Sequence, residues 1–139
     1  MGIVYAEITL KNAADRINRE RGFINEQDIR STSVTAVVDT GAMSLVITED
    51  LREKLGLAIM GEKKVLIANG QRVLCKVTEP VEINWKNRCS SLQAVKIPGA
   101  EKVLLGVIPL EDMDLIVNPV TQELEGAHGD TVECFALSA

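Results

Sequence analysis

The sequence predicts an all-β fold with one or two short helices, on the basis of three observations. Short apolar segments separated by turn residues recur along the 139 residues, helical periodicity is scarce, and an Asn-Gly pair at 69–70 separates two apolar runs. Asn-Gly in that setting is a strong signal of a β-hairpin, because both residues tolerate positive φ. At this length we expect one domain, residues 1–139, large enough to bury a core of its own.

The strands are predicted from alternating or continuous apolar runs bounded by turn residues. Residues 3–10 alternate between apolar and polar side chains, which is typical of a half-buried strand. Residues 11–30 carry nine charges without an apolar period, so they are predicted to form a solvated loop with at most one helical turn. The other predicted strands lie at 33–38, 45–47, 64–74 (as a hairpin), 80–86, 91–97, 103–106, 115–118 and 131–137.

Two short helices are predicted from their end signals. Thr48 is a suitable N-cap for a helix over 48–55, and Gly56 is a suitable stop. Leu51 and Leu55, four residues apart, give this helix an apolar stripe. Pro109 suits the first turn of a second helix that runs to about residue 113.

Composition excludes several function classes. The net charge of −5 leaves no basic stripe for phosphates, so we expect no nucleic-acid partner. No segment reaches the ~20 apolar residues of a membrane span, and the N-terminus lacks the pattern of a signal peptide, so we expect a cytoplasmic protein without a membrane partner. Cys75, Cys89 and Cys134 have no paired spacing and are interpreted as reduced thiols. A single histidine argues against a zinc site, and we expect neither metal nor cofactor.

The most informative motif is Asp39-Thr40-Gly41-Ala42, which directly follows the apolar run 34–38. A buried strand that ends in a carboxylate, a hydroxyl and a glycine is how aspartic peptidases present their catalytic acid, and the glycine permits the tight turn. Acid–base hydrolysis of this type needs two facing carboxylates, and the chain has one such motif. The second carboxylate must then come from another molecule. The alternative is an ordinary strand-to-turn transition, in which Asp39 serves only the turn.

Other candidate groups have weaker support. His128, in a glycine-containing segment, forms a nucleophilic pair only if a cysteine lies beside it, which the sequence leaves open. Glu111, Asp112 and Asp114 are interpreted as the solvated face of a short helix. Cys75 and Trp85 are interpreted as packing residues.

Three features in order make the chain resemble the retropepsin-like aspartic peptidases, specifically the small prokaryotic relatives of the retroviral enzymes. They are the motif within Val37–Ala42, a hairpin at Ile67–Val73 where the family has its flap, and Val103–Gly106, similar to the element that passes beneath the catalytic turn. The segment 109–119 is also similar to the family's helix and strand. The resemblance covers about residues 34–119. It implies a closed β-barrel, half of an acid protease, that functions as a C2 homodimer.

The resemblance also implies residue roles. Asp39, Thr40 and Gly41 would be catalytic, with Thr40 bracing the turn of the partner subunit. Substrate-binding residues would be Ala42 on the site floor and the flap residues Ile67, Ala68, Asn69, Gly70 and Gln71. Leu104, Leu105 and Gly106 would be structural. The chain departs from the family in its long 11–30 segment and in a flap tip without a glycine-rich run.

These features predict an aspartic endopeptidase that uses a water nucleophile, one Asp39 from each subunit and an extended polypeptide substrate. Residues 3–10 and 131–137 are the candidate segments for contact at the dimer axis. Two alternatives stay open: a catalytically silent dimer that binds peptides or serves assembly, and a peptidase that is latent until assembled or trimmed.

Overall fold

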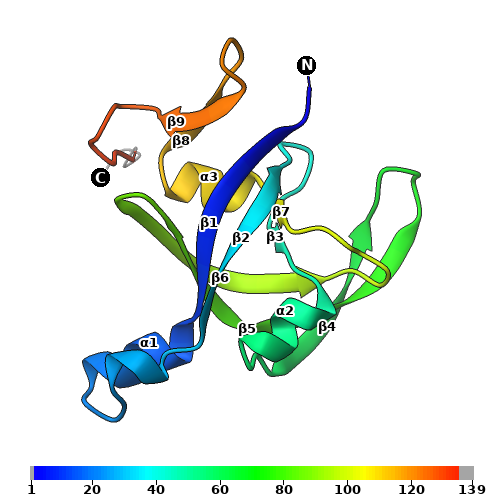
Figure 1. Cartoon of the computed structure of the whole chain (residues 1–139). Helices are drawn as coiled ribbons and strands as arrows, with labels where there is room; N and C mark the ends of the chain where they lie inside the picture. Colours follow the sequence, from blue (N-terminus) through cyan, green and yellow to red (C-terminus); the bar gives the residue numbers. More distant parts are fainter. Residues whose placement is uncertain (1, 135–139) are drawn as a thin grey trace, which may run out of the picture.

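The strands of the computed structural model, which describes residues 2–134, wrap into a barrel with helices at its ends (Figure 1). The elements in chain order are β1 (Val4–Asn12), α1 (Ala13–Glu20), the 3-10 turn η1 (Glu26–Asp28), β2 (Ser31–Val38), β3 (Leu45–Val46), α2 (Glu49–Lys54), β4 (Ile59–Leu66), β5 (Arg72–Trp85), β6 (Arg88–Lys96), β7 (Leu104–Leu105), α3 (Val107–Asp112), β8 (Leu115–Asn118) and β9 (Glu123–Gly126).

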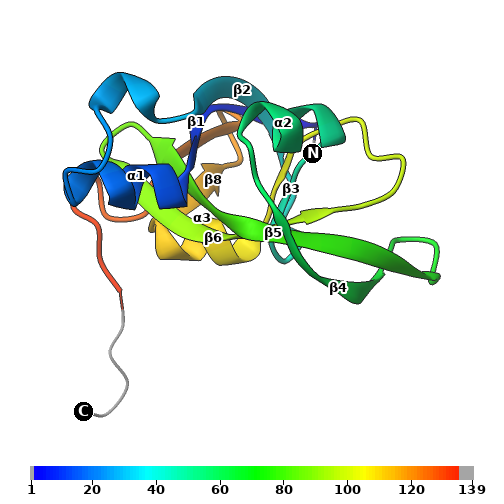
Figure 2. The same ribbon diagram turned by 90° about the horizontal axis from the view of Figure 1, so that it is seen from below.

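The main sheet has the strand order β1-β2-β7-β3-β6-β5-β4. It closes because the end of β1 also pairs with β5, from Thr9 opposite Asn84 to Asn12 opposite Val81. Strand β4 lies outside this closure and pairs only with β5, so the β4–β5 hairpin extends beyond the barrel (Figures 1 and 2). The predicted all-β closed barrel is therefore confirmed.

Strand β7 is short but central to the topology. It runs parallel to β2 and antiparallel to β3, and so separates two strands that are consecutive along the chain. The chain leaving β2 must therefore cross the end of β7 before it enters β3. This crossing places residues 39–44 directly beside the residues that follow β7.

The core follows from strand alternation, since successive side chains point to opposite faces. In β1 the even-numbered residues from Val4 to Leu10 are buried, and the odd-numbered residues are exposed or half-buried. The largest buried side chains come from several strands and from the turn after α2; they include Leu10, Leu45, Ile47, Leu57, Ile83 and Leu105.

The loop prediction for residues 11–30 is wrong, because α1 occupies residues 13–20. Asn12 caps this helix by accepting a hydrogen bond from the Asp15 N–H (3.1 Å). The Asp15 carboxylate then accepts two bonds from the Arg30 side chain (2.8 and 2.9 Å), and the helix buries only Ala13 and Asp15. Capping and a long-range ion pair stabilise α1 in place of an apolar stripe.

Helix α2 confirms the 48–55 prediction, with Thr48 accepting from the Leu51 N–H (3.3 Å). The second predicted helix is α3, which starts two residues before Pro109. With α1 the described chain has three α-helices rather than one or two.

Two strand predictions need correction, and one strand has no sequence prediction. Residues 72–85 form one continuous strand, with a register shift between Val77 and Pro80 that accommodates the proline. Strand β9, with Leu124 as its buried residue, was not predicted. Residues 131–134 are not in a strand, and residues 135–137 of that prediction lie outside the described residues.

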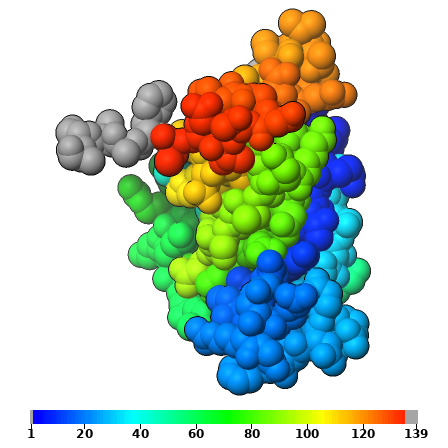
Figure 3. All heavy atoms as spheres, turned by 90° about the vertical axis from the view of Figure 1, so that its left-hand side faces the viewer, coloured from blue at the N-terminus to red at the C-terminus, as the bar shows by residue number. Residues whose placement is uncertain are grey.

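Residues 127–134, which follow β9, lie against the α3–β8 corner and the start of β6, and appear in red in Figure 3. None of the helices within residues 2–134 is long and apolar enough to span a membrane.

Candidate active site

The Asp39 turn is fixed by backbone hydrogen bonds at the end of β2. The Asp39 N–H donates to the Leu105 carbonyl (3.0 Å), which extends the β2–β7 pairing by one residue. The Gly41 N–H donates to Asp39 Oδ1 (2.9 Å), and the Ala42 N–H donates to the Asp39 carbonyl (3.1 Å). One carboxylate oxygen is thus held by the turn itself. Asp39 is half-buried, and Thr40 and Gly41 are exposed.

Gly106 and the first residues of α3 form the floor of this turn. The N–H groups of Gly106, Val107 and Ile108 donate to the carbonyls of residues 44, 42 and 43, each at 2.9 Å. A Cβ on Gly106 would lie 2.4 Å from the Ser44 carbonyl oxygen and 2.6 Å from that of Ala42. Only glycine therefore fits here, and the close packing explains the Leu-Leu-Gly sequence at 104–106.

An apolar row lies on the face of the sheet that carries Asp39. Val37 precedes Asp39 by two residues and so shares its face. Leu104 is opposite Val37 in β7, and Val46 is opposite Leu104 in β3. Val37 and Leu104 are half-buried, and Val46 is buried. The sequence alone does not reveal this row, because it depends on a register between strands far apart in the chain.

The predicted hairpin is confirmed. Gly70 has a φ of +85°, its N–H donates to the Ile67 carbonyl (3.0 Å), and the Ile67 N–H donates to the Gln71 carbonyl (2.9 Å). Ala68, Asn69, Gly70 and Gln71 are exposed, and the hairpin stands clear of the barrel in both ribbon views (Figures 1 and 2). Within residues 2–134 no hydrogen bond joins residues 67–71 to residues 39–42.

The structure thus brings residues 39–42 and 104–106 together, and leaves the hairpin tip apart from them. Two hollows are present, and neither is lined by the Asp39 turn or by Gly106. The first, of about 420 Å³, lies between the α3–β8 corner and residues 127–134, and the second, of about 300 Å³, lies between residues 85–88 and 124–130. In the described part of the chain no group of three or more His, Cys, Asp and Glu side chains is arranged to hold a metal.

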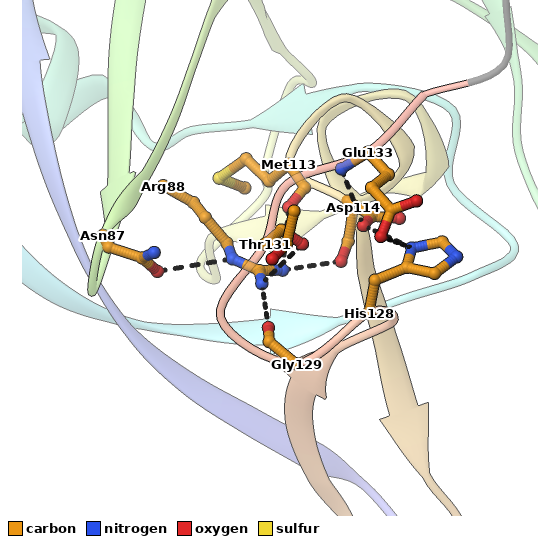
Figure 4. A network of polar contacts seen from close by, with 8 residues as sticks. All are labelled: Asn87, Arg88, Met113, Asp114, His128, Gly129, Thr131 and Glu133. Atoms are coloured by element: carbon orange, nitrogen blue, oxygen red, sulfur yellow. Dashed lines mark hydrogen bonds and ion pairs between the residues drawn. The ribbon is translucent and has the colours of Figure 1, made fainter.

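A polar network lies at the C-terminal end of α3 and includes Asp114 and His128 (Figure 4). Asp114 is not on a solvated helix face: it follows α3, and its carboxylate contacts His128 Nδ1 (2.7 Å) and accepts from the Glu133 N–H (3.0 Å). This contact lowers the pKa of Asp114 and raises the pKa of His128. No sequence signal pairs these two residues.

Arg88 is the buried member of this network, with 3% of its surface exposed. Its guanidinium donates to the backbone carbonyls of Met113 (3.1 Å), Asp114 (2.6 Å) and Gly129. A buried cation that contacts carbonyls of two segments joins residues 127–134 to the end of α3. This role is structural, and the network lies outside the candidate active site.

The profile of an aspartyl protease family matches residues 24–126, about three quarters of the chain. The chain therefore belongs to this aspartyl protease family, as its resemblance to the retropepsin-like peptidases predicted. Among solved structures it is similar to EIAV protease complexed with the inhibitor HBY-793, with 23% identity over 54% of this chain and 71% of that chain, at a TM-score of 0.44. No curated protein gives a significant match.

Proposed function

We propose that the chain is an aspartic endopeptidase whose active site contains one Asp39 from each subunit of a C2 homodimer. The observation that carries the proposal is the Asp39-Thr40-Gly41 turn held on the Gly106 floor, in a chain of the aspartyl protease family. The turn supplies one carboxylate per chain, and the chemistry requires two. A two-fold axis beside Asp39 completes the pair, so the interface is isologous.

Exposed apolar side chains beside the turn support an interface at this place. Met43 is 67% exposed and Ile108 is 48% exposed, and they are adjacent because the Ile108 N–H donates to the Met43 carbonyl. A second copy that buries them also brings Thr40 within reach of the partner's turn.

In the dimer the two Asp39 carboxyls share one proton, because like charges about 3 Å apart resist double ionisation. The ionised carboxylate acts as general base on a water molecule held between the pair. The protonated one donates its proton to the scissile carbonyl oxygen. As the carbon–nitrogen bond breaks, the roles reverse: the first carboxyl passes the proton taken from water to the leaving amine, and the second carboxylate takes back the proton from the carbonyl-derived hydroxyl. The reaction forms no covalent intermediate with the chain. The β4–β5 hairpin closes over the substrate and excludes water.

The apolar row of Val37, Leu104 and Val46 supports a preference for apolar side chains next to the cleaved bond. The side chains of an extended substrate alternate between its two faces, so every second substrate side chain points toward this row.

Cleavage of a diverse peptide library between about pH 4 and pH 7.5 tests the proposal, since carboxylates can divide acid and base roles there. We expect cuts between apolar residues that disappear in Asp39→Asn. Asp50→Asn is the control, because Asp50 is exposed on α2, outside the turn at residues 39–42 and its floor at 104–108. Cuts that persist in Asp39→Asn would refute the mechanism. Peptide binding that is unchanged in Asp39→Asn, without cleavage by the parent protein, would favour the alternative of a catalytically silent dimer that binds peptides.

A further inference from the structure

The β4–β5 hairpin, residues 59–78, carries a charge opposite to that of the rest of the chain. It has four cations, Lys63, Lys64, Arg72 and Lys76, and one anion, Glu62, for a net charge of +3. Since the whole chain has a net charge of −5, the remaining residues sum to −8. The positive charge is thus concentrated on the element that projects from the barrel (Figure 2).

Most of this charge is not neutralised within the chain. Lys76 pairs with Glu62 across the two strands. In the described residues no ion pair involves Lys63, Lys64 or Arg72, and all three are exposed. These three cations are free to contact another molecule.

Strand register sorts the hairpin into two faces. Lys64 is opposite Leu74 and Leu66 is opposite Arg72, so these four side chains share one face. Leu66 is 63% exposed and Leu74 is 53% exposed. We call these four residues the basic–apolar face.

The opposite face continues into the barrel. Val65 is opposite Val73 and both are half-buried, and Cys75, opposite Lys63, is fully buried. The basic–apolar face therefore points away from the barrel interior, and each of its leucines is more than half exposed.

Protection of a sheet edge explains only part of this pattern. Lysines on an edge strand prevent edge-to-edge aggregation, which accounts for Lys63 and Lys64 on β4. Arg72 lies on β5, which at this position pairs only with β4, so protection of an edge accounts for Arg72 as well. It gives no reason to expose two leucines. Cations interleaved with leucines match a segment in which acidic and apolar side chains alternate.

We propose that the basic–apolar face binds an acidic, leucine-containing segment of the polypeptide substrate, outside the bond that is cleaved. The inference rests on the proposed peptidase function and specifies its substrate class. Lys64 and Arg72 pair with substrate carboxylates, and Leu66 and Leu74 pack against its apolar side chains. Charge complementarity of this kind acts mainly on the rate of association and weakens as salt is added.

The test compares two peptides with the same apolar cleavage sequence, one extended by alternating Glu and Leu and the other by alternating Gln and Leu. We expect kcat/KM at low salt to be about 5- to 10-fold higher for the acidic peptide, since steering by a few charges has effects of this size. The preference disappears in the double variant Lys64→Glu, Arg72→Glu. It persists in Lys54→Glu, Lys102→Glu, which changes the net charge equally at two exposed lysines elsewhere.

Equal kcat/KM for the two peptides, with Asp39-dependent cleavage intact, would overturn this inference and leave the proposed function standing. If neither peptide is cleaved, the proposed function fails, and fluorescence anisotropy of the labelled acidic peptide decides the inference. Binding that requires Lys64 and Arg72 supports it. Binding of the acidic peptide that is unchanged in the double variant overturns the inference. It is also overturned if the protein binds the acidic and the neutral peptide equally but binds phosphatidylserine vesicles in a way that requires Lys64 and Arg72.

Discussion

Replacement of Gly106 by alanine is predicted to displace the Asp39 turn. The new Cβ would meet backbone atoms of residues 42–44 at 2.4 to 2.8 Å, and backbone cannot move aside as a flexible side chain does. Separation of the two segments weakens three hydrogen bonds of 2.9 Å, worth about 0.5–1.5 kcal/mol each. Overpacking of a rigid site adds about 1–3 kcal/mol. With the three hydrogen bonds weakened by about half, we expect a loss of about 2–5 kcal/mol of unfolding free energy, out of the roughly 5–15 kcal/mol of a typical domain.

Denaturant unfolding measures this loss, and peptide cleavage under native conditions measures the effect on the turn. Gly61→Ala is a matched control, because no atom lies within 4 Å of its added Cβ and its φ is not positive. We expect this control to match the parent protein or to gain up to about 1 kcal/mol from a less flexible unfolded chain. If Gly106→Ala unfolds and cleaves like Gly61→Ala, the argument for a close-packed floor under Asp39 is wrong.

Two further predictions concern the polar network of Arg88, Asp114 and His128. Arg88→Met is expected to lower the unfolding free energy by about 2–4 kcal/mol, because the buried Met113 carbonyl and the part-buried carbonyls of Asp114 and Gly129 lose their donor. Met at the exposed Arg21 is expected to have little effect, and equal stabilities of the two variants in denaturant would contradict this. Asp114 raises the pKa of His128 above its ordinary value of 6.5, so the pair stabilises the fold below that value, and its contribution is lost as the pH rises through the raised pKa. His128→Gln is therefore expected to lower the denaturant midpoint at about pH 6 and to have a smaller effect at about pH 9; a difference independent of pH would refute the assignment.

Local signals in the sequence were sufficient for the elements they control. Thr48 caps α2, Asn69-Gly70 closes the hairpin, and the Asp39 motif ends β2, because each depends on residues within a few positions. Leu-Leu-Gly at 104–106 is recognised instead by its resemblance to a family motif, because its packing depends on residues 42–44, about sixty positions away. The sequence alone gives no distance between Gly106 and residues 42–44.

Features that depend on distant residues were missed. Helix α1 is stabilised by an ion pair between Asp15 and Arg30, fifteen positions apart, and has no apolar stripe to reveal it. Arg88 is buried by carbonyls 25 to 43 positions away, where a charged residue next to a turn suggests exposure. The apolar row beside Asp39 likewise required the register of β2, β7 and β3.

The central claim is that two chains build one active site, and mixing the parent protein with Asp39→Asn tests it most directly. The concentration of the parent protein is held fixed. The total protein concentration is kept above the concentration at which activity per chain stops rising, and the subunits are allowed to exchange before the assay. With ninefold excess of the variant, random pairing leaves about one parent chain in ten with a parent partner, so activity falls to roughly one tenth. An equal excess of an inert protein is the control. Activity that stays at the level of this control would show that each chain acts alone, and would contradict the account.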